Sequence, residues 1–520
     1  MALIPITGIP SSYRTPGSYA EILFAQGPGT ASAGVRSVIF VMPMTAAGTW
    51  TAGTVYEVKN EGIARDGAGI GSPMHRGVRA FLKRNKSAKL YALPVAATTG
   101  GSPVAATGTI TYATTATAIG STTVTVCGDQ VSARINTGDT PTVIAAAVAA
   151  AINAQEQLPV TAANVAGVVT MTARIAGISQ GTATVGVIRF RAVITGSVGT
   201  TVATSGAALG LGTGTPGVEG TTTEAANLAT ALNAVRGTRN YYMAFSANDA
   251  TSLANIKTHL STKSTPNPGL RSVGITAWTG TSANGITLAQ ALNYERTQMV
   301  WQLNSEHDHA VLAGSMAATR QLNEELDAAY NFDGYRDVPW GCLPAFANTD
   351  WPTSDDHNDA INGGLTPIGS DAAGSYIVMT VTTRSKNAAG TVADFRAAET
   401  HRVSVADFVV DTMLIRYALN YANKKLASDR TLSNGTVDPN QRLSPGVVTP
   451  FTFLPFVKNI LNSFDVAQGG SLLQDVALSK ASLQVLRDPG NTGRLECGLD
   501  LRSVDLLHQA TFRVAEVSPG

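Results

Sequence analysis

Apolar runs and amphipathic segments alternate along much of the chain, and this pattern predicts an α/β core. The run from Ser37 to Met42 is almost continuously apolar, as in a strand that is buried on both faces. Ser72-Pro73 predicts the start of a helix, and Leu90–Val95 predicts a second strand. The first hundred residues therefore supply the beginning of a sheet flanked by helices.

The same alternation returns after residue 220. Crossover connections between such elements predict a mostly parallel or mixed sheet with helices on its faces. The predicted strands are Tyr241–Phe245, Ser272–Ala277 and Met299–Leu303, and the predicted helices are Glu224–Val235, Asp249–Leu260, Thr287–Glu295 and Asp308–Leu326. We therefore expect residues 36–97 and 221–370 to form one α/β core domain.

Between these two stretches the pattern changes. Residues 98–220 contain few ionised side chains and are bracketed by the Gly-containing segments 98–102 and 210–220. Thr122–Val126 and Val168–Thr172 predict short strands, and Thr142–Ala154 predicts one Ala-rich helix. This composition predicts an inserted, mainly β domain that faces outward from the core.

The C-terminal third, residues 371–520, predicts an α+β domain. An apolar run, Tyr376–Val381, predicts a strand, and the polar stretch Thr382–Arg402 predicts an exposed arm with a turn at Asn387–Gly390. Ser404 stands three residues before Asp407, as in a capping box, and predicts the start of a long helix. The expected apolar face of that helix comprises Val405, Phe408, Val409, Thr412, Met413, Arg416, Leu419 and Leu426.

Both ends of the chain predict extended arms. Prolines 5, 10 and 16 interrupt residues 1–24, so we expect an arm there without regular structure. Near the other end, Pro455 predicts a short helix to Phe464, and Leu495–Leu501 alternates like a half-buried strand. Thr511–Val517 alternates again, and a single terminal strand is stable only when another strand pairs with it.

Composition excludes several classes of protein. The 520 residues are 44% hydrophobic and only 14% charged, with a net charge of +1, so no basic stripe for nucleic acid is present. Three distant cysteines predict neither a disulfide framework nor a metal site. The proline-rich N-terminus does not resemble a signal peptide, and the Ala-rich run at 143–152 is too short to cross a bilayer.

Candidate chemistry is sparse. Ser179 lies in a G-x-S-x-G pattern, but the residues after it read as a strand, whereas a nucleophile elbow needs a helix there. Residues 212–217 match G-x-G-x-x-G, yet Pro216 removes an amide and no helix follows at once, so we interpret them as a linker. His307 and His309 could bind one metal ion together only if their segment is extended. We favour the alternative, in which these residues form a strand-to-helix junction with Asp308 at the N-cap. We predict no catalytic, cofactor or metal site, although a triad assembled from distant residues stays open.

Three stretches resemble the contractile-tail sheath proteins of the Mu-like phage type. The first is the arm TRSKNAAGTVADFR with the following ETHRVSVADFVVDTMLIRYALNYANKKLASD, residues 383–396 and 399–429. The second is Arg14–Glu21, RTPGSYAE, which resembles the R-x-P-G-x-Y-x-E entry segment of that family. The third is the region 228–365. The resemblance covers most of the chain outside residues 98–220.

The resemblance implies a structural protein rather than an enzyme. It implies hexameric rings stacked around an inner tail tube, bounded by baseplate and tail terminator proteins, which contract to drive the tube through a cell envelope for genome ejection. Such a virion tail sheath is assembled in the host cytoplasm, without direct nucleic-acid binding or stable membrane insertion. The terminal arms would link subunits by strand addition, through Pro16, Gly17, Tyr19, Ile22, Phe512, Arg513 and Val514. The alternatives are the sheath of a bacteriocin or secretion apparatus and, with less support, an α/β hydrolase.

Overall fold

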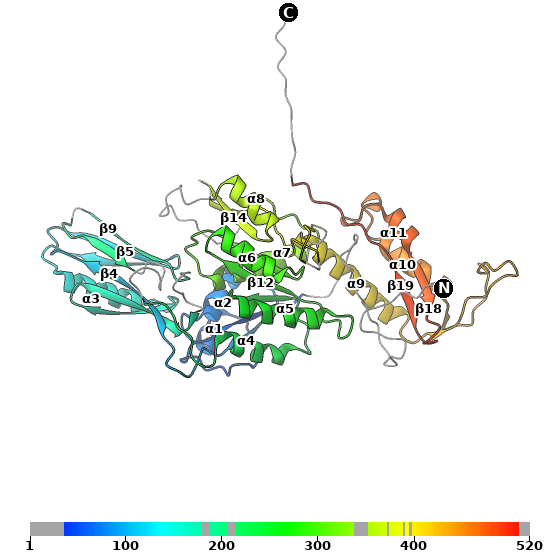
Figure 1. The fold of residues 1–520 in the computed structure, drawn as a ribbon, viewed down its shortest axis with the longest axis horizontal. Helices are drawn as coiled ribbons and strands as arrows, with labels where there is room; N and C mark the ends of the chain where they lie inside the picture. Colours follow the sequence, from blue (N-terminus) through cyan, green and yellow to red (C-terminus); the bar gives the residue numbers. More distant parts are fainter. Residues whose placement is uncertain are drawn as a thin grey trace, which may run out of the picture.

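An eight-stranded sheet organises the larger part of the protein (Figure 1). The structure, a computed structural model, describes residues 36–178, 187–196, 198–205, 215–336, 352–371, 374–387, 390–394 and 398–508. The strand order is β15-β14-β13-β12-β11-β1-β3-β2. The inner strands pair in parallel, while β2 and β15 pair antiparallel at the two edges, so the sheet is mixed. The strands are β1 Val38–Pro43, β2 Tyr56–Glu57, β3 Leu90–Val95, β11 Tyr242–Phe245, β12 Val273–Trp278, β13 Thr297–Trp301, β14 Thr366–Asp371 and β15 Gly374–Ile377.

Helices cover both faces of this sheet, as crossover connections require. Hydrophobic side chains of α2 and α7 pack on one face, beside α1, and those of α4, α5, α6 and α8 pack on the other. The helices are α1 Glu61–Ala68, α2 Pro73–Arg84, α4 Glu224–Leu232, followed by a 3₁₀ turn at Asn233–Val235, α5 Ala250–Ser264, α6 Ser282–Leu292, α7 His309–Glu324 and α8 Ser354–Asn362. The α/β alternation predicted from the sequence is confirmed, although α6 begins five residues before the predicted start.

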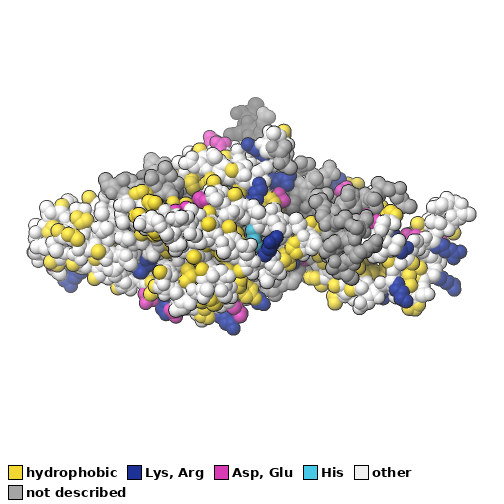
Figure 2. Space-filling model, turned by 60° about the horizontal axis from the view of Figure 1, so that its bottom comes forward, with side chains coloured by type: hydrophobic (Ala, Val, Ile, Leu, Met, Phe, Trp, Pro, Cys, Tyr) yellow, Lys and Arg dark blue, Asp and Glu magenta, His cyan; other side chains and the backbone are white. Residues whose placement is uncertain are grey.

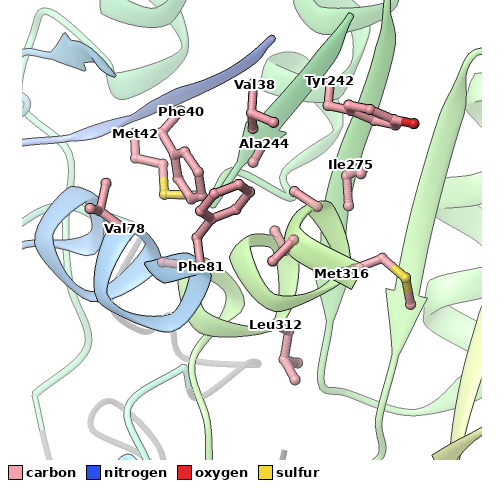
Figure 3. Close-up of a cluster of buried hydrophobic side chains, with 14 of the residues drawn as sticks. Val38, Phe40, Met42, Val78, Phe81, Tyr242, Ala244, Ile275, Leu312 and Met316 are labelled. Atoms are coloured by element: carbon pink, nitrogen blue, oxygen red, sulfur yellow. The ribbon is translucent and has the colours of Figure 1, made fainter. Parts of the chain in front are cut away.

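The core under α2 and α7 is closely packed (Figure 3). Phe40 of β1 and Phe81 of α2 meet edge to face, with ring centroids 5.7 Å apart. Gly77 and Gly314 let the two helices approach closely, because a Cβ on Gly314 would stand 2.6 Å from the Gly77 carbonyl oxygen. This contact fixes the position of α7, and with it the side chains that α7 presents at both ends.

Residues between β3 and α4 form two further sheets around a separate hydrophobic cluster. Figure 1 shows this part projecting from one end of the molecule. The four-stranded sheet has the order β10-β4-β8-β7, and the three-stranded sheet has the order β6-β5-β9. The elements are β4 Ala105–Tyr112, β5 Gly120–Val126, β6 Asp129–Ile135, α3 Pro141–Asn153, β7 Val160–Val165, β8 Val168–Ala176, β9 Phe190–Thr195 and β10 Val202–Ser205.

The C-terminal elements lie at the opposite end, connected to the core by the long helix α9 (Figure 1). They have their own hydrophobic cluster, to which Tyr417 and Tyr421 from the end of α9 contribute. The elements are α9 Thr400–Asn420, β16 Lys425–Leu426, β17 Val447–Val448, α10 Pro450–Asn462, a 3₁₀ turn at Val466–Gln468, α11 Val476–Ser482, β18 Gln484–Arg487 and β19 Leu495–Gly498.

Several predicted boundaries in this region are wrong. The strand expected at 376–381 ends at Ile377, and α9 ends at Asn420, before Leu426. The helix expected to begin at Pro455 begins at Pro450, because Thr449 forms a capping box with Thr452; Pro455 lies inside it. In α10 the local start signal was therefore Thr449 and not the proline at 455.

Residues 98–220 enter and leave the core side by side. Thr99 and Thr222 form an antiparallel bridge, as do Val104 and Val218. Replacing residues 101–217 by a short Gly/Ser linker is therefore expected to give a soluble chain with a single cooperative unfolding transition, checked by circular dichroism during thermal unfolding. Recovery of aggregate alone would show that this segment is needed for the core to fold.

Candidate functional site

The amino ends of four adjacent parallel strands carry arginines. One arginine lies one to three residues before each of these strands: Arg36 before β1, Arg239 before β11, Arg271 before β12 and Arg296 before β13. Because the amino ends of parallel strands meet at one edge of a sheet, these guanidinium groups collect there. All but Arg239 are almost fully buried. A row of buried cations requires carboxylates nearby, since isolated buried charge is costly.

Helix α9 supplies two of those carboxylates. Asp407, fully buried, accepts bonds from Nη1 and Nη2 of Arg296 at 2.7 and 2.9 Å and from the Tyr241 hydroxyl at 3.0 Å. One turn later, Asp411 accepts from Nη2 of Arg271 at 2.6 Å and from Nη2 of Arg239 at 2.5 Å. The spacing i, i+4 places both carboxylates on one face of the helix. The first half of α9 is thereby held across the amino edge of the sheet.

Helix α7 supplies the third carboxylate. Glu324 accepts from the Ser404 hydroxyl of α9 at 2.6 Å and from the Tyr242 hydroxyl at 2.8 Å, and it pairs with Arg320 and Arg36. The Arg320 guanidinium also donates to the Ser404 hydroxyl at 3.0 Å. We call these groups, with Asp407, Asp411 and the four edge arginines, the α9 network. It joins the sheet, α7 and α9 by charge-assisted bonds away from water.

The pKa values in the network follow from this geometry. Burial acts to raise the pKa of Asp407, but Arg296 and Arg271 outweigh it and lower the pKa to about 2. Burial acts to lower the pKa of Arg36, but Tyr241, Tyr242 and Glu324 raise it further above its ordinary value. Both groups are therefore charged at neutral pH.

The sequence interpretation of Ser404 and Asp407 as a helix start is wrong. Helix α9 begins at Thr400 with Glu399 at the N-cap, so both residues lie within the helix and face the core. The stretch Thr382–Arg402 is not a wholly exposed arm either, because Thr382, Thr383 and Asp394 are buried. The predicted turn is confirmed, since the Gly390 amide donates to the Asn387 carbonyl at 2.8 Å.

A second charged cluster joins the 98–220 segment to the core. Arg76 of α2 donates from Nε to Asp308 at 2.5 Å and from Nη1 to Asp129 at 3.2 Å. Asp308 also accepts from the Val311 amide, which confirms its predicted N-cap role. Arg191 of β9 pairs with Glu306 at 3.2 Å. These contacts fix the orientation of the segment relative to the sheet.

Of the two histidines beside Asp308, His309 is buried in this junction and His307 is half-buried. The His309 Nε2 lies 3.0 Å from the Thr279 hydroxyl, and a Cβ added to Gly128 would lie against the His307 ring. Burial lowers the pKa of both to about 4, so both are neutral at pH 7. Among the described residues, no group of three or more potential ligands is placed to hold a metal ion. In the same residues, no helix has the length and hydropathy of a membrane span.

Among the residues that the structure describes, the C-terminal sheet has two strands. β18 and β19 pair antiparallel, so each strand has one edge outside this pair. Leu495, Cys497, Leu499 and Leu501 pack toward the local cluster, which agrees with the predicted alternation. Regular structure ends at Gly498, however, and Glu496 on the other face is buried and paired with Arg494 at 2.9 Å. Isolated two-stranded sheets are marginal, and further strands would stabilise this one.

The predicted linking residues Pro16, Gly17, Tyr19, Ile22, Phe512, Arg513 and Val514 lie outside the described residues, as do Ser179 and Cys342. Sequence reasoning missed the arginines of the α9 network. Their signal was an arginine just before each of several buried strands, together with carboxylates at 407 and 411 on an otherwise apolar helix face.

Solved structures similar to this chain include sheath proteins. A sheath tail protein from Desulfitobacterium hafniense is 14% identical with a TM-score of 0.44, covering 94% of this chain and 100% of that one. A sheath tail protein from Listeria innocua is 14% identical with a TM-score of 0.45, covering 92% and 94%. The anti-feeding prophage helical sheath in the contracted state is 9% identical with a TM-score of 0.41, covering 99% of each chain. No protein-family model and no curated protein matches the chain.

Asp407→Asn is expected to destabilise the protein by about 3–5 kcal/mol, because it leaves Arg296 and Arg271 buried without their carboxylate. Urea unfolding of the full chain measures this. Asp500→Asn, at an exposed position, is the matched control and should change the free energy of unfolding by less than about 0.5 kcal/mol. Equal stability of the two variants would contradict the role assigned to Asp407.

Acid is expected to destabilise the protein at a pH well above the range in which Asp407 titrates. His307 and His309 have folded-state pKa values of about 4 against an ordinary 6.5, so the unfolded chain binds protons first as the pH falls. The free energy of unfolding should decrease between pH 6.5 and 4, by about 1.4 kcal/mol per pH unit for each histidine. Urea titrations across this range test this, and His309→Gln should reduce the slope. If His309→Gln leaves the dependence of the unfolding free energy on pH unchanged, the lowered pKa assigned to His309 is contradicted.

Proposed function

We propose that this chain is the structural subunit of a contractile tail sheath. The observation that carries the proposal is the α9 network. It couples a small C-terminal region, whose sheet has two strands among the described residues, to a large α/β core through one helix held by buried charges. A polymer that contracts requires such coupling, because a subunit can transmit movement between neighbours only if its contact regions keep fixed positions on its body.

The proposed linkage between subunits is strand addition. Backbone donors and acceptors at a sheet edge bind an extended segment, and alternate side chains set its register. In our proposal, the N-terminal arm around Pro16, Gly17, Tyr19 and Ile22 and the C-terminal strand around Phe512, Arg513 and Val514 extend the β18–β19 sheet of neighbouring copies. The sheet would then gain the strands that it needs for stability.

We divide the chain accordingly. Residues 1–24 would be the N-terminal arm, 36–97 with 221–370 the α/β core, 98–220 an outward-facing inserted domain, and 371–520 the assembly domain. The face in Figure 2 is dominated by hydrophobic and uncharged side chains, with charged groups scattered among them. Weakly charged surfaces associate readily, which suits a crowded array.

The proposed assembly is a stack of hexameric rings around an inner tail tube, ending at baseplate and terminator proteins, in the tail of a virion. A sheath of a bacteriocin or secretion apparatus would use the same subunit chemistry and is the alternative. No arrangement of nucleophile, base and orienting group among the described residues favours the hydrolase. We propose a structural role without enzymatic activity.

The test is assembly of the purified chain. Wild-type protein is expected to form tubes or rings in negative-stain electron microscopy. Arg513→Pro removes one backbone donor and fixes φ, which should cost about 3 kcal/mol at each linking contact. The variant should be folded by circular dichroism and monomeric by sedimentation.

Arg513→Ala keeps the backbone donor and is the matched control, so it should assemble like the wild type. The chain lacking residues 101–217 should also assemble. A wild type that remains monomeric would contradict the proposed function. Normal polymerisation of Arg513→Pro would contradict only the linkage through the C-terminal strand.

A further inference from the structure

The last described segment of the chain returns from the C-terminal elements toward the core, drawn in red in Figure 1. We call residues 501–508 the strap. Its first half is held by backbone bonds, because Leu473 and Ser503 form an antiparallel bridge and the Val504 amide donates to the Leu472 carbonyl at 3.1 Å. Among the described residues, no backbone–backbone hydrogen bond holds residues 505–508. The second half of the strap therefore depends on its side chains.

Charged side chains attach this second half to α7 and α9. Asp505 Oδ1 accepts a bond from Nη2 of Arg402, near the start of α9, at 2.8 Å. His508 lies between two carboxylates. Its Nδ1 is 2.5 Å from Oδ2 of Asp333, in the loop after α7, and its Nε2 is 3.5 Å from Oε2 of Glu399, the N-cap residue of α9. The end of the described chain is thus fixed at one histidine.

This geometry requires a protonated ring at position 508. An ionised carboxylate only accepts hydrogen bonds, and a neutral imidazole donates from one nitrogen alone, whereas an imidazolium donates from both. Both ring nitrogens of His508 face carboxylate oxygens, so only the imidazolium can donate to Asp333 and Glu399 together. In the neutral ring, one nitrogen lone pair would face a carboxylate oxygen, and that contact would be lost.

The other charged groups of this cluster favour the same state. Arg402 lies 3.4 Å from Glu399, and the buried His401 has Nδ1 3.1 Å from the same carboxylate. Asp505, whose side chain is 63% exposed, faces Arg402 from the strap itself. With the carboxylate of the α7 loop, three carboxylates therefore surround one guanidinium. A positive charge on His508 reduces this excess of negative charge.

The pKa of His508 agrees with this geometry. Burial acts to lower the pKa, but Asp333 and then Glu399 outweigh burial and raise it above the ordinary value of 6.5. A group whose pKa is raised by folding contributes stability that is complete below its unfolded pKa and is lost as the pH rises through its folded pKa. The contact of the strap with the two carboxylates is therefore complete below pH 6.5 and is lost in mild alkali.

We propose that His508 is a pH-dependent latch, which holds the strap on Asp333 and Glu399 when the ring is protonated and releases residues 505–508 when the ring is neutral. Its consequence for assembly rests on the proposed function. Phe512, a predicted linking residue, follows His508 by four residues, so the closed latch fixes the point from which the linking strand starts. Release adds four residues, about 13 Å of extended chain, to the arm. A fixed start reduces the conformational entropy that is lost when the strand pairs with a neighbour.

Limited proteolysis of the dilute full-length chain, shown to be monomeric by sedimentation, tests the latch. Chymotrypsin cleavage after Leu507 is compared with cleavage after Leu432, an exposed leucine of the loop 430–446, so that the pH dependence of the protease itself cancels. The ratio of the two rates should rise about fivefold between pH 6 and 8.5, as expected for the loss of a partly exposed ion pair. His508→Gln should give the high ratio at both pH values, and His508→Arg, which stays charged, the low ratio.

His357→Gln, on α8, is the matched control and should keep the rise of the wild type. A wild-type ratio that does not change with pH, or a rise that persists in His508→Gln, would overturn the latch.

The assembled fraction at higher protein concentration is a separate readout. It should decrease from pH 6 to 8.5 in the wild type and stay constant in His508→Arg. If cleavage responds to pH and assembly does not, the link between the latch and assembly is overturned. A wild type that is monomeric at both pH values would contradict the proposed sheath function and leave the latch itself supported by the proteolysis.

Discussion

The pairing of the α9 carboxylates with the arginines at the amino edge of the sheet is the interaction on which the rest of the structure depends. Arg271 and Arg296 are buried by the fold of the sheet itself, and Asp407 and Asp411 are their counter-charges. Replacing a whole buried ion network by apolar groups is often neutral, whereas removing one partner is costly. The main effect of the network is therefore to determine the position of α9 on the sheet, and its net contribution to the free energy of unfolding is smaller.

That position has consequences at both ends of the molecule. Beyond its buried half, α9 extends away from the core, and Tyr417 and Tyr421 pack into the C-terminal cluster. At the other end, Arg76, Asp129 and Asp308 fix the 98–220 segment. The protein is thus an α/β body with a further region held at each of two opposite ends by buried ion pairs. In the proposed sheath, these fixed positions would allow a small movement at one contact between subunits to be transmitted to the next contact.

The α/β alternation could be predicted from the sequence because buried strands and capped helices leave local signals. The bounds of β3 agree with the prediction, and α2, α5 and α7 begin within one residue of the starts predicted at Ser72-Pro73, Asp249 and Asp308. Ser404 was misread because a capping box and a pair of buried polar residues have the same local spacing. Only the tertiary environment separates them. The arginine row also required knowing that four strands lie side by side in parallel. The linkage that we propose for the terminal arms would depend on other copies of the chain, so its partners cannot be read from the pattern of one chain.

Hydrogen exchange of the full-length chain, followed by mass spectrometry, tests the central claim most directly. If the α9 network holds the helix to the sheet, the backbone amides of 404–412 exchange as slowly as those of β11 and β12. Asp407→Asn should then increase the exchange rate of the α9 amides and leave that of the β11 and β12 amides unchanged. Exchange of 404–412 as rapid as that of the exposed loop 430–446 in the wild type would contradict the claim, because α9 would then move independently of the core.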